Sequence, residues 1–173
     1  MRSVASLLFV LLLSAFCGAQ SGDRVDVFGG FSYVRPDFTG IGPGGPGWNI
    51  AGSVKVVRFL RAVGDFSGFY PTGSDGANAH YHMFLGGPEV AVRVGTYRPF
   101  AHFLLGATTG NLTYAGSQGG GDFSDFTAGA GGGVDIGSHR FAFRAQADWL
   151  HITRQFSPSN DVARISTGLV VRF

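Results

Sequence analysis

The chain has 173 residues, a formal net charge of +2 and 45% hydrophobic residues. So small a net charge gives no support to a nucleic-acid partner, and the apolar content argues against a disordered chain. Its only cysteine is Cys17, which excludes an intramolecular disulfide.

Residues 1–19 have the three parts of a cleavable secretory signal peptide. Arg2 provides the charged start, an apolar run follows, and residues 17–19 are the small residues before a cleavage site. The apolar run is shorter than the ~20 residues of a membrane-spanning helix. Phe16 stands where a lipoprotein signal needs a small residue. We therefore predict cleavage after residue 19 and a mature domain of residues 20–173 that contains no cysteine.

Period-two alternation of side chains recurs through the mature domain and predicts eight β-strands. The strands are expected at 24–35, 47–57, 61–71, 80–92, 98–109, 122–137, 140–151 and 162–173. Long connections are expected at 36–46, 72–79, 110–121 and 152–161, and short ones at 58–60, 93–97 and 138–139. Short periplasmic turns alternating with long external loops are typical of outer-membrane barrels. We predict an all-β fold, an eight-stranded antiparallel up-and-down transmembrane β-barrel.

The last expected strand shows the alternation most clearly. Phe173, Leu169 and Ile165 share one face, whereas Arg172 and Arg164 share the other. A strand that is apolar on one face and charged on the other separates lipid from a polar interior. We expect the protein to end with this strand, without a further domain.

Five of the seven Trp and Tyr residues fall on the apolar face, at the external ends of their strands. An aromatic girdle at the membrane boundary explains this placement, because these rings prefer an interface. The predicted girdle consists of Tyr33, Trp48, Tyr70, Tyr81 and Trp149.

Parity puts Met83 and Leu85 on the lipid side together with Tyr81. Strict alternation would then put Glu89 in lipid. We predict a β-bulge at residues 86–87 that turns Glu89 inward, although a position at the headgroup level is an alternative.

The opposite face of the strands carries charges of both signs. The predicted lumen network contains Asp26, Lys55, Asp65, Asp135, Arg144, Asp148, Arg164 and Arg172, with Gln146, His82 and His102 among them. Asp148 is expected near Arg164, Asp26 near Arg172, and Asp135 diagonal to Arg144. Buried charges must be paired, so we predict a structural plug of salt bridges. A proton or ion path and a catalytic cluster are the alternatives.

Other motifs carry little weight. His80 and His82 have a spacing that a metal could use, but no third ligand is evident. The glycines at 129–133 lack the strand–loop–helix context of a phosphate-binding loop and are expected to make room for bulky neighbours. We predict no metal, no cofactor and no catalytic residue, and any chemical role of His80, His82 or His151 stays open.

Basic residues gather near the short turns, where the sequence has Arg58, Arg61, Arg93, Arg98 and Arg140. They suggest contact with anionic lipid headgroups, or else simply solvated strand ends.

The chain resembles the small outer-membrane barrel family that includes the OmpA transmembrane domain and OmpX. The resemblance rests on residues 27–33, 131–135, 144–148 and 169–173 and extends over the mature domain. It implies a location in the bacterial outer membrane and a role of Phe173 in recognition by the barrel-assembly machinery. The peptidoglycan-binding domain of OmpA has no counterpart here, so cell-wall tethering is not implied.

We therefore expect a non-enzymatic integral outer-membrane protein with a structural or surface-interaction role and a largely plugged lumen. Its expected partners are outer-membrane lipids, the assembly machinery and an unspecified external partner, with no nucleic acid. One alternative is a small pore. A second is a lipid-modifying enzyme with a Ser/His/acid set drawn from His80, His151, Ser74 and Asp75. A third is a soluble secreted barrel that binds a small ligand inside.

Overall fold

The structure is a computed structural model that describes residues 24–36, 44–70, 78–113, 121–153 and 160–173. The predicted signal peptide lies outside the described residues, as do Ser74 and Asp75. Within the described ranges, no helix has the length and apolar character needed to span a bilayer.

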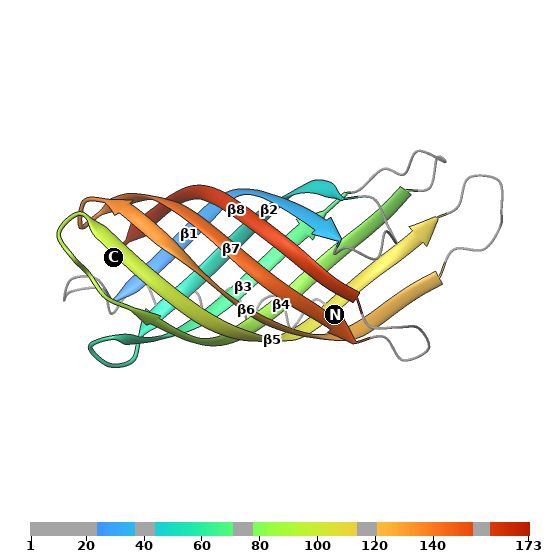
Figure 1. Cartoon of the computed structure of the whole chain (residues 1–173), viewed down its shortest axis with the longest axis horizontal. Coiled ribbons are helices and arrows are strands. Elements are labelled where there is room, and N and C mark those ends of the chain that lie inside the picture. Colours follow the sequence, from blue (N-terminus) through green and yellow to red (C-terminus); the bar gives the residue numbers. More distant parts are fainter. Residues whose placement is uncertain (1–23, 37–43, 71–77, 114–120, 154–159) are drawn as a thin grey trace, which may run out of the picture.

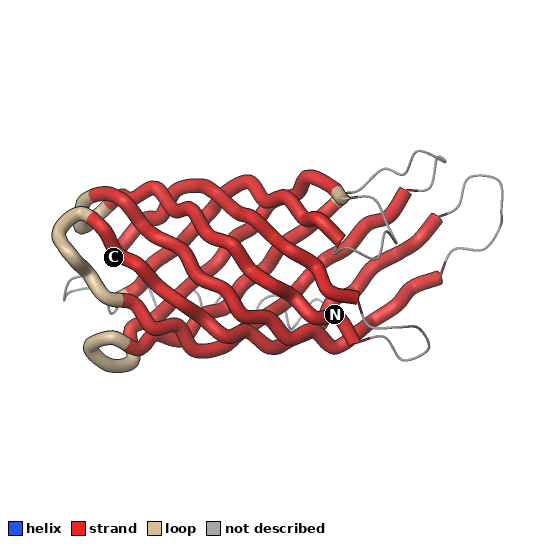
Figure 2. Tube along the Cα trace, viewed as in Figure 1, coloured by secondary structure: helices blue, strands red, loops and turns tan. Residues whose placement is uncertain are grey.

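Eight strands form one closed antiparallel sheet, in which β1 pairs with both β2 and β8 (Figure 1). The strands are β1 (Val25–Pro36), β2 (Gly45–Lys55), β3 (Leu60–Phe69), β4 (Asn78–Ala91), β5 (Tyr97–Thr113), β6 (Gly121–Gly137), β7 (Phe141–Thr153) and β8 (Asn160–Arg172). They are tilted against the long axis, with the short turns at the end where the chain terminates (Figure 2). The predicted eight-stranded up-and-down barrel is confirmed.

Side chains alternate between the two faces of the barrel wall. On β8, Ile165 and Leu169 point outward and are 62% and 65% exposed, whereas Arg164 and Val170 are fully buried. Large apolar side chains are exposed in the same way on every strand except β3, which is followed by the exposed Tyr70. An apolar surface of this extent needs a lipid environment.

The predicted bulge in β4 is wrong. The β3–β4 register runs unbroken from Leu60 opposite Val90 to Phe69 opposite Tyr81, and the β4–β5 register is the same on both sides of residues 87–88. Met83 and Leu85 are buried inside, and Phe84 faces outward instead. Since Met83, Leu85 and Glu89 share one parity, Glu89 is inside without any bulge.

The loop-facing part of the interior contains an apolar cluster, which the sequence analysis did not anticipate. A buried cluster there is formed by Val63, Phe69, Met83, Leu85, Leu104, Leu150, Ile152 and Val162, with Val34 and Tyr81 packed against it. A second, smaller apolar cluster consists of Phe28, Ala51, Ala142 and Val170. Apart from Asp125 near the loop end of β6, the buried charges are concentrated in the middle of the barrel and toward the short turns.

Candidate functional site: the charged lumen

The middle of the lumen is organised around Arg164 on β8, which is completely buried. Its Nη1 and Nη2 donate to the two carboxylate oxygens of Asp65 on β3, at 2.7 and 3.1 Å. Its Nε donates to Asp148 on β7 at 2.8 Å. The same Nη1 also donates to the hydroxyl of Ser67 at 3.1 Å. One side chain thus links β8 with its neighbour β7 and with β3 across the lumen.

Both carboxylates also have further partners. His102 Nε2 lies 2.7 Å from Asp148 Oδ1, and Gln146 Nε2 donates to Asp148 Oδ2 at 3.0 Å. Asn49 Nδ2 donates to Asp65 Oδ2 at 2.8 Å. Buried carboxylates are tolerated when their lone pairs are satisfied in this way. We call Asn49, Asp65, Ser67, His102, Gln146, Asp148 and Arg164 the central cluster.

Glycines on β6 provide the space for this cluster. Gly131 lies directly opposite Asp148, and a Cβ atom added to it would come within 2.1 Å of Asp148 Oδ1. At Gly129 an added Cβ would meet Leu150 Cδ2 at 2.5 Å. The glycine-rich segment therefore makes room for bulky β7 side chains, as the sequence analysis expected.

A second cluster lies nearer the short turns and is centred on Asp135 of β6. Three arginines donate to this carboxylate: Arg98 Nη2 at 2.7 Å, Arg144 Nε at 2.7 Å and Arg172 Nη2 at 2.9 Å. Arg144 also stacks over the Phe100 ring, with its Cζ 4.2 Å from the ring centroid. Such stacking is a favourable environment for a guanidinium.

The same cluster continues to β1, β3 and β4. Arg61 Nη2 lies 2.9 Å from Asp26 Oδ1, and its Nε lies 3.6 Å from Glu89 Oε1. Arg98 bridges Asp26 to Asp135, because its Nη2 also bonds to Asp26. We call Asp26, Arg61, Glu89, Arg98, Asp135, Arg144 and Arg172 the turn-end cluster.

The structure brings seven of the eight lumen residues named from the sequence into these two clusters. The expected pairs are present: Asp148 with Arg164, and Asp26 with Arg172, whose Nε lies 3.9 Å from Asp26 Oδ2. Asp135 and Arg144 are directly opposite in the β6–β7 register rather than diagonal.

Two residues predicted for the lumen lie outside the buried clusters. Lys55 has the inner parity, but its side chain is exposed at the mouth of the barrel beside Arg61 and Arg98, because β2 ends there. His82 faces outward, where its ring lies 6.0 Å from Phe66 and 6.3 Å from Tyr70. The one-residue parity error in β4 that moved Met83 and Leu85 to the lipid side also moved His82 to the lumen.

Arg61 and Arg98 were assigned to the turns, yet both side chains are buried in the turn-end cluster. A signal for this existed in the sequence. Arg61 shares the parity of Asp65, and Arg98 shares that of His102. Because both residues lie next to turns, the sequence analysis counts them among the turn residues instead.

Of the five residues predicted for the girdle, Tyr33, Tyr70 and Trp149 are exposed on the outer face near the loop end. Trp48 lies on the same face, and its Nε1 donates to the Tyr70 hydroxyl at 3.2 Å. Tyr81 is the exception, because it packs against the interior apolar cluster.

The outer face also carries a histidine–carboxylate pair. His151 Nδ1 lies 2.6 Å from Asp161 Oδ1, and the two side chains are 39% and 38% exposed. They occupy the loop ends of β7 and β8. Among the described residues, no group of three or more His, Cys, Asp or Glu side chains is arranged to hold a metal ion.

No protein-family model and no curated protein matches the chain. Solved structures do share its architecture. Neisserial surface protein A is 12% identical, with a TM-score of 0.74 over 86% of this chain and 97% of that chain. The attachment invasion locus protein Ail of Yersinia pestis is 17% identical, with a TM-score of 0.64 over 88% and 99%. The outer membrane enzyme PagL is 12% identical, with a TM-score of 0.54 over 85% and 99%.

The chain has the fold of the small outer-membrane β-barrels. The predicted resemblance to eight-stranded barrels of the OmpA and OmpX kind is confirmed at the level of the fold. An apolar exterior on this fold agrees with the predicted outer-membrane location.

Proposed function

We propose that this outer-membrane barrel is a non-enzymatic, non-conducting protein with a structural or surface-interaction role. The observation that supports this most directly is the bond between Arg164 and Asp65 across the lumen. An eight-stranded barrel is just wide enough for side chains to fill. Here the central cluster and the apolar cluster next to it occupy that space.

A conductance measurement tests whether the lumen is closed to ions. The purified protein in planar bilayers is expected to stay silent at all applied voltages. Discrete channels whose conductance changes on Arg144→Ala or Asp148→Ala would instead identify a small pore. The same bilayers should show channels on addition of a known porin, which controls for insertion.

The barrel-assembly machinery is a proposed partner during biogenesis. Phe173 completes the barrel seam, since its backbone N–H donates to the Val25 carbonyl at 2.8 Å and its carbonyl accepts from the Arg24 N–H at 2.9 Å. We expect Phe173→Ala to lower the amount of folded protein in the outer membrane, while refolding in detergent from urea stays close to that of the native protein. Equal losses in cells and in detergent would assign Phe173 to packing alone.

A second candidate function is the modification of membrane lipids. The exposed His151–Asp161 pair has the geometry of a histidine oriented by a carboxylate, and Thr153 lies two residues further on the same face. The similarity to the outer membrane enzyme PagL makes this candidate worth testing. Lipid A mass spectra from cells with the native protein, with His151→Ala and without the protein should be identical if the barrel has no such activity.

A further inference from the structure

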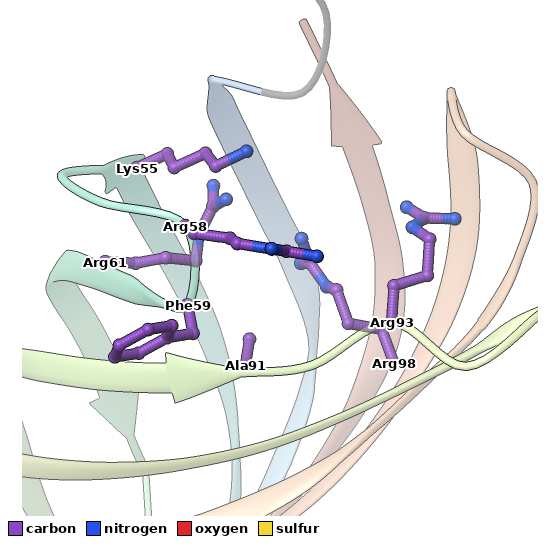
Figure 3. Close-up of a pocket in the computed structure, with 7 residues that line it drawn as sticks. All are labelled: Lys55, Arg58, Phe59, Arg61, Ala91, Arg93 and Arg98. Carbon is purple, nitrogen blue, oxygen red and sulfur yellow. The ribbon is translucent and has the colours of Figure 1, made fainter.

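The turn end of the barrel contains a small basic pocket. It has a volume of about 90 Å³ and is lined by Lys55, Arg58, Phe59, Arg61, Ala91, Arg93 and Arg98. Five of these seven side chains are cationic and none is acidic. A volume of about 10–15 Å³ already holds one water molecule, so the pocket has room for a small anion. In Figure 3 the basic side chains reach over one opening, and the Phe59 ring points away from it.

The basic residues at this end form two layers. In the lower layer, the three acids of the turn-end cluster, Asp26, Glu89 and Asp135, are in contact with Arg61, Arg98, Arg144 and Arg172. In the upper layer, Lys55, Arg58 and Arg93 add three cationic side chains to the pocket lining, which includes no acidic side chain. Charges of one sign around a concave opening raise the local concentration of counter-ions.

The types and origins of the side chains favour an oxyanion. Guanidinium groups bind phosphate-type oxygens through paired N–H donors, and an ammonium adds a point charge. Arg58 is on the β2–β3 turn, Arg93 is on the β4–β5 turn and Lys55 ends β2, so donors approach from two turns. A tetrahedral phosphate presents oxygens in several directions and can contact both turns at once.

We infer that the turn-end mouth of the barrel is a binding site for a phosphate-type oxyanion. Arg61 and Arg98 form its floor and are held in place by Asp26, Glu89 and Asp135. Lys55, Arg58 and Arg93 are its outer ligands. The site does not depend on whether the lumen conducts ions. The oxyanion is either a free phosphate or the phosphate of an anionic lipid headgroup, and both present the same chemistry to the pocket.

Calorimetry of the mature protein in octyl glucoside, a detergent without phosphate, tests this site. One titration uses inorganic phosphate and the other uses dihexanoyl phosphatidylglycerol. The test variant is Arg58→Gln/Arg93→Gln. The matched control is Arg24→Gln/Arg140→Gln, which removes the same charge from the same end of the barrel but outside the pocket. The altered mobility of unboiled protein on a gel shows that each variant is folded.

We expect at least one probe to bind the native protein. The pocket variant should bind that probe with a dissociation constant at least about tenfold higher, and the control variant should change the dissociation constant by less than about twofold. Binding of inorganic phosphate identifies a free anion as sufficient, and binding of the lipid alone identifies a headgroup site. Absence of binding by both probes at millimolar concentration would overturn the inference. An equal weakening in the two double variants would also overturn it, since it would show a diffuse surface charge rather than a site.

Discussion

Arg164 and Asp65 face each other across the lumen, from strands β8 and β3, which are not neighbours in the sheet. Two hydrogen bonds of 2.7 and 3.1 Å join the guanidinium to both carboxylate oxygens. Both side chains are buried, so Asp65 depends on Arg164 for compensation of its charge, and Arg164 depends on Asp65 and Asp148.

Removal of one partner should therefore destabilise the barrel strongly. Arg164→Ala leaves Asp65 buried without its main counter-charge, and the loss of a buried partner typically costs about 3–5 kcal/mol. We expect a loss of this size in the free energy of unfolding, measured by urea titration in detergent micelles. Asp65→Ala and the double variant complete a cycle in which the two losses should be clearly non-additive.

Arg140→Ala serves as the control for these variants, because Arg140 is exposed on the β6–β7 turn. Its effect should stay within about 0.5 kcal/mol. A similarly small effect of Arg164→Ala would contradict the central role assigned to this arginine.

Gly131 should not accept a larger side chain. The Cβ of Gly131→Ala would overlap the Asp148 carboxylate and the Ala147 carbonyl oxygen, at 2.1 and 2.7 Å. We expect a loss of about 1–3 kcal/mol in the free energy of unfolding, as for other overpacked sites. Gly52→Ala is the matched control, since an added Cβ at Gly52 meets nothing within 4 Å. Equal stability of the two variants would refute the proposed packing.

Intrinsic fluorescence offers a test of the outer girdle. The chain has only two tryptophans, Trp48 and Trp149, and both lie on the outer face near the loop end of the barrel. In vesicles of brominated lipids, bromines near the headgroups should quench the emission more than bromines near the bilayer centre. The variants Trp48→Phe and Trp149→Phe allow each ring to be measured separately. If bromines near the bilayer centre quenched the emission most strongly, the two tryptophans would not lie at the membrane boundary, and the girdle assignment would be contradicted.

The lipid-facing surface should tolerate charge only at its edges. Ile165 is near the middle of β8 and 62% exposed, whereas Val94 is on the β4–β5 turn and 63% exposed. We expect Ile165→Arg to lose about 2–4 kcal/mol of folding free energy in lipid vesicles and Val94→Arg to lose about 0–1. A barrel exposed to water at both positions would show no such difference, so equal effects would argue against a bilayer environment.

The sequence was sufficient to predict the number of strands, their order and most of the lumen charges. This is because alternation along β1, β7 and β8 is regular, with Arg164 and Asp148 on one parity and Trp149 and Ile165 on the other. Opposite charges on adjacent strands also predict cross-strand pairs such as Asp148 with Arg164. The long connections contain no comparable periodic signal.

Strand β4 shows where this reasoning fails. Its residues 81–85 are Tyr, His, Met, Phe and Leu, so both faces have large side chains and the pattern does not distinguish them. The predicted parity put Tyr81 on the outer face with the girdle, but Tyr81 packs inward. An error of one residue in the parity exchanges the inner and outer faces of the strand, and it then requires a bulge that the structure does not contain. Glu89, as the one acidic residue of the strand, was the better guide to its inner face.

Arg98 forms hydrogen bonds to two carboxylates, Asp26 on β1 and Asp135 on β6, and this has a consequence for the assembly of the barrel. Asp26 is on the first strand to emerge, and Arg172 is on the last. While β1 and β8 are still unpaired, these charged side chains lack some of their counter-charges, and a partly closed barrel would expose isolated charges to the lipid. Membrane insertion and barrel closure are therefore thermodynamically coupled, because partly closed barrels are destabilised by their unpaired charges.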